Sequence, residues 1–580
     1  MDNVRFALLC ALGVIGFFLW QAWQADYAEP APREQVAERG ELASAAADDV
    51  PSIDAAPGEG SGEDTQAQDD TRPEMGPATD GDTLPGGERI RVVTDKFVAE
   101  IDTRGGDLRR LELRGVPVSQ DRPDNDLRLL NDRIPNFFIA QNGLIGAEHA
   151  APNHNDDFES ARDEYRLAEG EERLEVPLTW TDDAGRRVTK TYVFTRGSYE
   201  IGLRHEVTNG SDSDWTVSPY ARLWRTPYEH SEDAPFAQSF MGVAWYQAKQ
   251  DEKGEYRFEK LDFGDVAEQP LKAQQTGGWI AMMQHYFLGA LVPAPDTTVS
   301  YFARPKNIPG SRLSGYESGY VGGRTRIAAG ETAVLESDLF LGPKLRDQLD
   351  AAARGLPLTV DYGLLTVIAE PLFWVLDALH SLVGNWGWAI VLLTVLIKLA
   401  FYKLSETQFR AMARMRKFAP RIQQLKEQYG DDRQKLQSKM MDLYKKEGFN
   451  PLGGCWPLLV QMPVFIALYW VLRESVELRH ADFMLWINDL SSPDPFYILP
   501  VAFGITMFAQ QKLSSSSMTM DPMQQRMMQI MPVALAVFFA FFPAGLVLYW
   551  FTNNLLSIAQ QWYIYRKLDN EGLSHKSASS

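Results

Sequence analysis

The chain has few of the residues on which metal and redox chemistry depend. It contains two cysteines, Cys10 and Cys455, which lie far apart at or in apolar segments, so a disulfide framework is not indicated. Its eight histidines are scattered, and none stands at a metal-ligand spacing such as HExxH. We therefore expect no metal centre and no cofactor.

Net positive charge is lacking as well. The 57 Lys and Arg are outnumbered by 77 Asp and Glu, and the formal net charge of −20 argues against a chain that binds DNA or another nucleic acid as a whole. The acidic excess is concentrated between Asp26 and Glu88, where 17 acidic residues stand against three arginines. Aromatic and branched apolar side chains are scarce there, so the stretch cannot bury enough surface to offset its ordering entropy. We predict a disordered acidic linker over residues 26–89.

From about Ile90 onward, apolar and polar residues alternate with the period of two that is typical of half-buried strands. The alternation is clear over residues 174–180, 188–194 and 199–207, and the turn signals TDDAG and NG follow the first and last of these runs. Strands at this spacing predict an antiparallel β-sandwich over residues 90–355.

Six apolar segments are candidates for membrane-spanning helices. The first, Phe6–Trp23, ends in tryptophans of the kind that anchor a helix in the interface. We interpret residues 1–25 as an uncleaved transmembrane helix, with a cleaved signal peptide as the alternative. The other five lie within residues 386–404 and 451–567: Trp386–Tyr402, Pro457–Leu472, Phe496–Leu513, Met527–Phe542 and Ala544–Tyr563. The predicted fold class is thus a multi-domain chain with a six-span α-helical membrane domain and a β-sandwich.

The segment before these five spans, residues 356–385, is amphipathic. Glu370, Pro371 and Asp377 interrupt its apolar residues, which predicts a helix lying in the membrane interface. Several of the spans have only 16 or 17 residues, near the lower limit for crossing a bilayer. Such short helices thin the bilayer around them or leave their polar flanks partly immersed.

The distribution of charge between the spans predicts the orientation. Tyr402–Trp456 carries 12 basic and six acidic residues, whereas Arg473–Pro495 carries two basic and five acidic residues. Because cytoplasmic loops are enriched in Lys and Arg, the first connection is predicted to be cytoplasmic and the second periplasmic. Alternation then places the amino terminus and the tail, residues 568–580, in the cytoplasm, and the β-sandwich outside.

The cytoplasmic connection, residues 405–450, reads as a helical hairpin in which Pro420 interrupts the first helix and YGDD forms the turn. Its basic residues are Arg414, Arg416, Lys417, Arg421 and Lys426. A solvated charged face explains this pattern, and so does a docking surface for an anionic partner such as ribosomal RNA. The loop alone does not decide between the two.

One lysine, Lys398, lies inside the apolar run VLLTVLIKLAFYKL. It is close enough to the cytoplasmic end of its span to extend its amine into the headgroups, and a functional role is the alternative. Other strong hydrogen-bonding side chains share the cytoplasmic half or the middle of the spans: Thr394, Gln461, Gln510, Gln511, Gln529, Asn553 and Asn554. The outer halves are almost purely apolar, so a continuous channel is not predicted. This distribution favours a functional cavity that opens to the cytoplasm and lipid and is closed towards the outside.

Long motifs resemble a known family over nearly the whole chain outside the acidic linker. They are FVAEIDTRGGDLRRLELR, LTVDYG, LVGNWGWAIVLLT, NPLGGCWPLLVQMPVFIALYWVLRESVELR, ILPVAFGITMFAQQKL, TMDPMQQRMMQIMPV and FPAGLVLYW. Together they closely resemble the bacterial YidC insertases of the YidC/Oxa/Alb group, in the Gram-negative form with a large periplasmic domain.

The resemblance implies insertion of newly made proteins into the bacterial inner membrane, alone or with the Sec translocon. It implies five core helices around a positively charged hydrophilic groove, a periplasmic β-supersandwich, and a cytoplasmic hairpin that engages the ribosome or substrate. Nascent membrane proteins and lipids are then partners, and no enzyme activity is expected. The groove residues carried over are Lys398, Thr394, Gln461, Gln511, Asn554, Tyr549 and Trp550. Two depart from the family pattern, because Lys398 replaces the usual arginine and Trp550 stands where a tyrosine is common.

Two other classes of function are weighed against insertion. Large β-sandwiches can house a tethered sugar-active enzyme, which would need paired carboxylates or a histidine with an acidic residue. A small-solute transporter is weakened by the absence of internal repeats in the sequence. The enzyme alternative would leave the polar residues within the spans unexplained.

Overall fold

The computed structural model describes residues 84, 86–227, 240–247, 257–309, 314–429, 432–446, 456–515 and 522–570. The predicted first transmembrane helix, most of the acidic linker and residues 571–580 lie outside this described part. The chain divides into two compact units. The described part of one covers the chain up to Asp361, together with Glu474–Glu477, and that of the other covers Tyr362–Arg473 and the residues from Leu478 onward.

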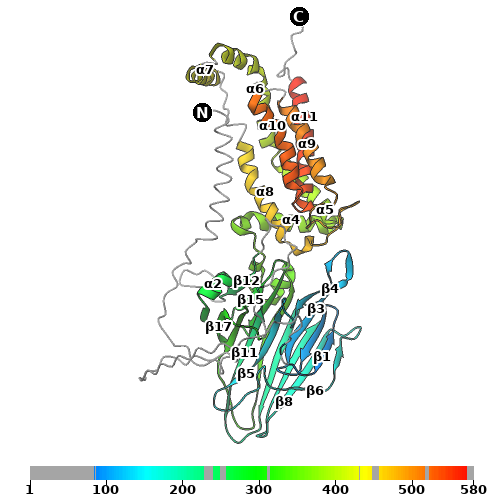
Figure 1. Cartoon of the computed structure of the whole chain (residues 1–580), viewed down its shortest axis with the longest axis vertical. Helices are drawn as coiled ribbons and strands as arrows, with labels where there is room; N and C mark the ends of the chain where they lie inside the picture. Colours follow the sequence, from blue (N-terminus) through cyan, green and yellow to red (C-terminus); the bar gives the residue numbers. More distant parts are fainter. Residues whose placement is uncertain are drawn as a thin grey trace, which may run out of the picture. The chain divides into compact units, whose positions relative to one another are not determined.

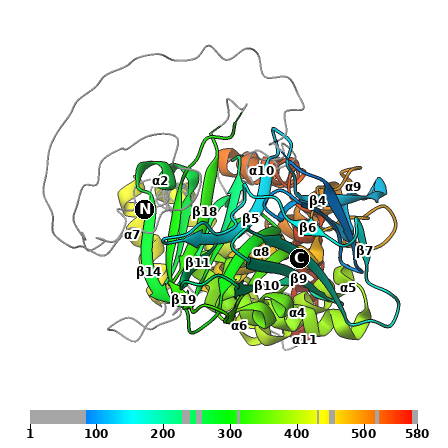
Figure 2. The ribbon, with the colours of Figure 1, turned by 90° about the horizontal axis from the view of Figure 1, so that it is seen from below.

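The first unit is a β-sandwich whose two sheets pack face to face (Figures 1 and 2). Within the described residues one sheet has 11 strands, with the order β14-β17-β18-β11-β5-β3-β2-β1-β7, β4 beside β3 and β19 beside β11. Its strands are β1 (Arg89–Val93), β2 (Phe97–Asp102), β3 (Asp107–Ser119), β4 (Arg122–Leu130), β5 (Phe138–Gly146), β7 (Glu164–Arg166), β11 (Trp215–Arg225), β14 (Leu271–Thr276), β17 (Thr298–Pro305), β18 (Tyr316–Gly322) and β19 (Thr325–Ile327).

The second sheet has nine strands in the order β13-β12-β15-β16-β20-β10-β9-β8-β6. They are β6 (Glu159–Ser160), β8 (Arg173–Thr181), β9 (Arg186–Thr195), β10 (Glu200–Asn209), β12 (Gly242–Tyr246), β13 (Phe258–Asp262), β15 (Trp279–Met283), β16 (Phe287–Pro293) and β20 (Thr332–Pro343). The three alternating runs of the sequence are β8, β9 and β10, so their prediction is confirmed. The described part of the unit also contains two short α-helices, α2 (Phe263–Glu268) and α3 (Arg346–Ala352), and a 3-10 helix, Leu356–Thr359.

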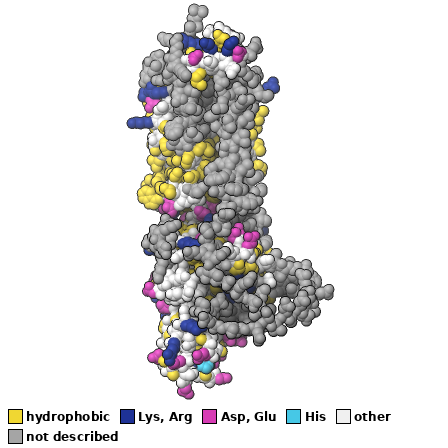
Figure 3. Space-filling model, turned by 90° about the vertical axis from the view of Figure 1, so that its left-hand side faces the viewer, with side chains coloured by type: hydrophobic (Ala, Val, Ile, Leu, Met, Phe, Trp, Pro, Cys, Tyr) yellow, Lys and Arg dark blue, Asp and Glu magenta, His cyan; other side chains and the backbone are white. Residues whose placement is uncertain are grey.

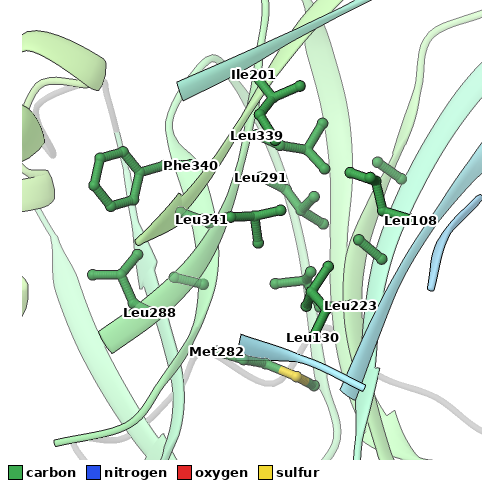
Figure 4. Packing of buried hydrophobic residues seen from close by; sticks show 14 of the residues in the cluster. Leu108, Leu130, Ile201, Leu223, Met282, Leu288, Leu291, Leu339, Phe340 and Leu341 are labelled. Atoms are coloured by element: carbon green, nitrogen blue, oxygen red, sulfur yellow. The ribbon is translucent and has the colours of Figure 1, made fainter. Parts of the chain in front are cut away.

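The sandwich core lies between the sheets (Figure 4). Leu108, Leu130 and Leu223 from the 11-stranded sheet share one buried cluster with Ile201 and Leu339 from the nine-stranded sheet. Each such side chain contributes about 1.5–3 kcal/mol by leaving water, and this burial fixes the register, because a slip by one residue would turn the apolar set to solvent. The predicted antiparallel pairing holds except at one edge, where β1 and β7 pair in parallel.

Charged groups are also buried in the sandwich. The Glu317 carboxylate accepts hydrogen bonds from Arg222 Nη1 at 2.9 Å and Arg304 Nε at 2.6 Å, and Lys306 Nζ lies 3.7 Å away. Arg222 in turn donates to Gln141 Oε1, and its Nη2 lies 3.1 Å from His154 Nε2. Glu317 and Arg222 are fully buried. Because three cations surround Glu317, it serves as a counter-ion and does not form the free acid–base pair that a sugar-active enzyme would need.

A second buried cation, Lys190, lies near by on β9. Its Nζ donates to the backbone carbonyls of Gly105 at 2.6 Å and Asn142 at 2.8 Å. Burial lowers the pKa of Lys190 to about 8, although the charge of Asp107 opposes the change. Both clusters join strands of the sandwich through groups that hydrogen-bond backbone or one another, which is how buried polar groups avoid the cost of desolvation.

The second unit is helical (Figure 1). Its helices are α4 (Thr366–Val383), α5 (Trp386–Ala400), α6 (Tyr402–Tyr429), α7 (Arg433–Lys446), α8 (Trp456–Glu474), α9 (Ile498–Ser515), α10 (Pro522–Phe539) and α11 (Ala544–Asn570). The last residue of α8, Glu474, belongs to the other compact unit. Helix α11 packs against α5, α6 and α9, while α10 packs against α9, and α4 against α5. Gly504 permits the close approach of α9 and α10, because a Cβ there would lie 2.9 Å from the Cβ of Ala536.

The five C-terminal apolar segments are all helical, and each helix end lies within a few residues of its predicted position, apart from the start of α10 and the end of α11. By length and composition, the described residues contain one continuous helix that is suited to crossing a membrane, and this is α4. Helix α5 and the start of α6 would provide a second, bent by 62°. The six crossings and the interfacial position of residues 356–385 therefore stay predictions.

The hairpin differs from its prediction in one respect. Helix α6 runs without a break from Tyr402 to Tyr429, so the prediction that Pro420 interrupts it is wrong. A proline removes one backbone hydrogen bond and crowds the preceding turn, which bends a helix without necessarily ending it. The helix ends at Tyr429, beside the predicted turn, and α7 follows at Arg433.

Candidate functional site

Lys398 lies in the last turn of α5, two residues before the helix ends at Ala400. Its side chain is half-buried, and its Nζ donates a hydrogen bond of 2.8 Å to the hydroxyl of Ser557 on α11. Among the described residues no carboxylate lies within ion-pairing distance of this ammonium. The lysine is therefore directed towards α11 and has a neutral partner, whereas a lysine that only extended into the headgroups would point away from the helices.

Ser557 belongs to a row of residues spaced four apart on α11. The row is Tyr549, Asn553, Ser557, Gln561 and Tyr565. Residues four apart are neighbours on a helix surface, so these side chains form one continuous strip. The described members from Tyr549 to Gln561 are buried, and Gln561 Nε2 donates to the Tyr565 hydroxyl at 3.1 Å. The strip brings polar groups into the centre of the helical unit.

The predicted residues Gln461 and Asn554 also belong to this region. Gln461 on α8 donates from Nε2 to Asn553 Oδ1 at 3.2 Å, which connects α8 to the strip. Asn554 is buried beside Asn553 on α11. Thr394 is buried one turn before Lys398, but its hydroxyl donates to the Ile390 carbonyl of its own helix at 2.7 Å. The Thr394 hydroxyl is therefore already hydrogen-bonded within its own helix.

The remaining predicted glutamines are less central. Gln511 is half-buried near the end of α9, the helix that packs beside α11. Gln510 is also half-buried near the end of α9, and Gln529 is exposed on α10. Neither Gln510 nor Gln529 belongs to the polar strip on α11.

An aromatic cluster lies at the opposite end of the strip from Gln561 and Tyr565. Trp550 contacts one ring from each of three helices, with centroid distances of 4.6 Å to Phe465, 6.1 Å to Phe503 and 5.7 Å to Phe539. Asn553 follows Trp550 by three residues, or about 4.5 Å of helix. The polar strip therefore ends abruptly at a packed apolar layer.

The hairpin residues are less completely described. Arg421 is exposed on α6, whereas the side chains of Arg414, Arg416, Lys417 and Lys426 lie outside the described residues. The base of α6 is packed on the end of α11, where Phe409 joins Ile564 and Leu568 in one buried cluster. In Figure 3 the described surface of the helical unit shows a concentration of hydrophobic side chains, with Lys and Arg towards the end that carries α6 and α7.

Among the members of the strip that sequence reasoning missed are Ser557 and Gln561. Serine is common in helices near polar neighbours, and its hydroxyl is too weak a signal to be noticed alone. The spacing of four from Asn553 to Ser557 and Gln561 was present in the sequence and could have identified both.

A β-sandwich joined to a helical unit with many exposed apolar side chains, and with a lysine held among neutral polar groups, is the arrangement expected of a membrane protein that carries a separate folded domain. Two family models match consecutive parts of the chain, one described as the YidC periplasmic domain over residues 89–375 and one as the 60Kd inner membrane protein over residues 378–571. Together they place the chain in the inner membrane with a periplasmic domain.

Relatives match over nearly the full length. The membrane protein insertase YidC of Thioalkalivibrio sulfidiphilus is 47% identical over 99% of this chain and 100% of its own length. That of Nitrosococcus oceani is 46% identical, with the same coverage of 99% and 100%. A solved structure described as an active YidC insertase has a TM-score of 0.37 and 18% identity, covering 83% of this chain and 94% of that chain. The chain belongs to the YidC family of membrane protein insertases.

Proposed function

We propose that this chain inserts newly made proteins into the inner membrane, alone or with the Sec translocon, by receiving a short hydrophilic segment at the polar strip of α11. The observation that carries the proposal is the Lys398 ammonium, held half-buried against Ser557 with no carboxylate within ion-pairing distance among the described residues. A buried charge with a neutral partner is costly, so it is retained where a ligand of opposite charge completes the site.

The physical problem is to move a polar segment through hydrocarbon. A strip of hydrogen-bonding groups that reaches to the middle of the spans shortens the apolar distance, and short helices thin the bilayer further. Lys398 attracts an acidic residue in the leading segment, and the membrane potential assists its transfer outward. The aromatic cluster around Trp550 keeps the strip closed to the periplasm, while apolar parts of the substrate pass along the helices into lipid. No covalent step is involved.

This function is tested by photocrosslinking from position 461 to ribosome-stalled nascent chains of an inner-membrane protein. Gln461 contacts the strip through Asn553, so we expect crosslinks when the leading hydrophilic segment has just emerged and their loss once insertion is complete. A crosslinker at the exposed Ile505 on α9 is the matched control. Equal crosslinking from both positions at every chain length would contradict entry at the strip.

The orientation follows from the same proposal. Helices α5, α8, α9, α10 and α11, with the amino-terminal segment, cross the membrane, α4 lies in the periplasmic interface, and both termini are cytoplasmic. The exposed Val367, Trp374 and Leu382 on α4 support contact with lipid.

We expect a cysteine at Asn209 or Ser491 to be labelled by an impermeant reagent in intact cells, and a cysteine at Gly430 to be labelled only after permeabilisation. This expectation follows from the charge of the connecting loops, because cytoplasmic loops are enriched in Lys and Arg. Labelling of position 430 from outside would overturn the orientation.

The hairpin is proposed to dock the ribosome. Replacing Arg414, Arg416, Lys417 and Arg421 together by glutamine should weaken ribosome association, because phosphate contacts release counter-ions, and it should flatten the dependence on salt. Cosedimentation with ribosomes over a series of salt concentrations measures both effects. Glutamine at Lys435 and Lys439 on α7 provides a control with fewer charges removed, and unchanged binding in the fourfold variant would favour the solvated-face interpretation.

A further inference from the structure

Ser557 is the described residue that fixes where the charge of Lys398 lies. Its hydroxyl donates to the Asn553 carbonyl at 2.7 Å and accepts from Lys398 Nζ at 2.8 Å. Since the single hydroxyl proton is used by the backbone carbonyl, a lone pair is left to face the ammonium. Ser557 is itself buried.

These hydrogen bonds belong to a chain that connects three helices. Lys398 on α5 bonds to Ser557, Ser557 bonds to the backbone of Asn553 one turn earlier on α11, and the Asn553 side chain accepts from Gln461 on α8. The ammonium is thereby held one turn of α11 from the amides of Asn553 and Gln461. It uses one of its three N–H donors on Ser557, and among the described residues the other two have no protein acceptor.

The Lys398 ammonium has an alternative position in the headgroup region of the membrane. The residue lies two positions before the end of α5, and Leu396 and Leu399 beside it are exposed on the same helix. A lysine stem of this reach can extend its amine to the headgroup region when nothing holds it. The hydrogen bond to Ser557 is the one polar contact among the described residues that opposes this.

We propose that Ser557 is a positioning residue that holds the Lys398 ammonium at the polar strip, and so determines the depth at which an acidic side chain of a substrate is received. The inference rests on the proposed function and adds to it a contact that selects between acidic and neutral substrates. Without the Ser557 hydroxyl the charge remains in the protein but moves to the interface, so substrates with an acidic leading segment lose their advantage while neutral ones do not.

The test uses the full chain in proteoliposomes and two substrates that differ only by Asp or Asn in the translocated segment. The measured quantity is the ratio of acidic to neutral insertion for Ser557→Ala, Ser557→Thr, Lys398→Ala and the Ser557→Ala/Lys398→Ala double variant. Thr506→Ala is the matched control, since the buried Thr506 hydroxyl bonds only to the Phe503 carbonyl of its own helix among the contacts described.

We expect Ser557→Ala to lower the ratio by about three- to tenfold, the range for the loss of one ordinary intramolecular hydrogen bond. Ser557→Thr and Thr506→Ala should keep the wild-type ratio. The double variant should fall no further than Lys398→Ala, because the two residues act as one unit.

Three results would overturn the positioning role: an unchanged ratio in Ser557→Ala, an equal loss of both substrates, or a double variant whose loss is the product of the two single losses. Wild-type vesicles that insert neither substrate would instead overturn the proposed function.

Discussion

Lys398→Glu is expected to abolish most insertion of a substrate with an acidic translocated segment and to impair an otherwise identical neutral substrate less. The substitution places a carboxylate where the ammonium now contacts Ser557, so it repels the segment that the lysine attracts. Lys398→Ala should be intermediate, with about a tenfold loss for the acidic substrate, which corresponds to about 1.4 kcal/mol. Lys398→Arg should insert both substrates, because charge and reach remain. The measurement is protease protection of the inserted segment in proteoliposomes.

Lys398→Leu separates this role from a simple interfacial anchor. If the lysine served only to reach the headgroups, leucine would be tolerated or would stabilise the helix, because a charge costing about 2.5–3.5 kcal/mol at a helix centre is removed. With the proposed role, leucine should resemble alanine in its selective loss of the acidic substrate. Equal insertion of the substrate pair by the wild type and by the Ala and Glu variants would reduce Lys398 to an anchor. Residual insertion is expected, since Gln461 and Asn553 still bond to each other.

Glu317→Gln is expected to destabilise the β-sandwich by about 3–5 kcal/mol, the usual cost of removing one partner from a buried ion pair. The carboxylate compensates Arg222, which is also fully buried, and Arg304 and Lys306 lie beside it. With glutamine in its place the cluster loses the carboxylate that these cations share. Amide hydrogen exchange of β5, β11 and β18 in the full chain reports the opening free energy locally.

The control for this variant is Glu164→Gln, which removes an exposed pair with Arg166 of similar length, 2.7 Å. Exposed pairs contribute about 0–1 kcal/mol, so protection in these strands should change little. If Glu317→Gln left the exchange of β11 and β18 as slow as in the wild type, the cluster would not be a stabilising ion network.

Much of the architecture could be predicted because it depends on local periodicity. The alternation in β8, β9 and β10 follows from one buried and one outer face, and the apolar runs of α8, α9 and α10 follow from burial in lipid or in the helical unit. Lys398 and Gln461 could be identified because each interrupts an apolar run. A strongly polar side chain in such a run is improbable without a partner, so each of these residues is recognisable by itself.

Other features could not be predicted because their signal is shared between distant segments. The pairing of β1 with β7 and the edge position of β14 depend on strands far apart in sequence. The continuity of α6 through Pro420 could not be recognised either, because local propensity favours a break and the rest of the helix outweighs it. The aromatic cluster around Trp550 gathers Phe465, Phe503 and Phe539 from three helices, and none of these rings is unusual in its own segment.

The sequence by itself determined the two kinds of unit, the presence of a lone positive charge among neutral polar residues in the apolar segments, and the long motifs that mark the family. Only the tertiary structure decided which way the charge points and what ends the polar strip. Lys398 could reach either the headgroups or α11 with the same stem, and the choice depends on the Ser557 hydroxyl, 159 residues away. A side chain's energy depends on the groups packed around it, and helix packing brings those groups together from positions that no local pattern connects.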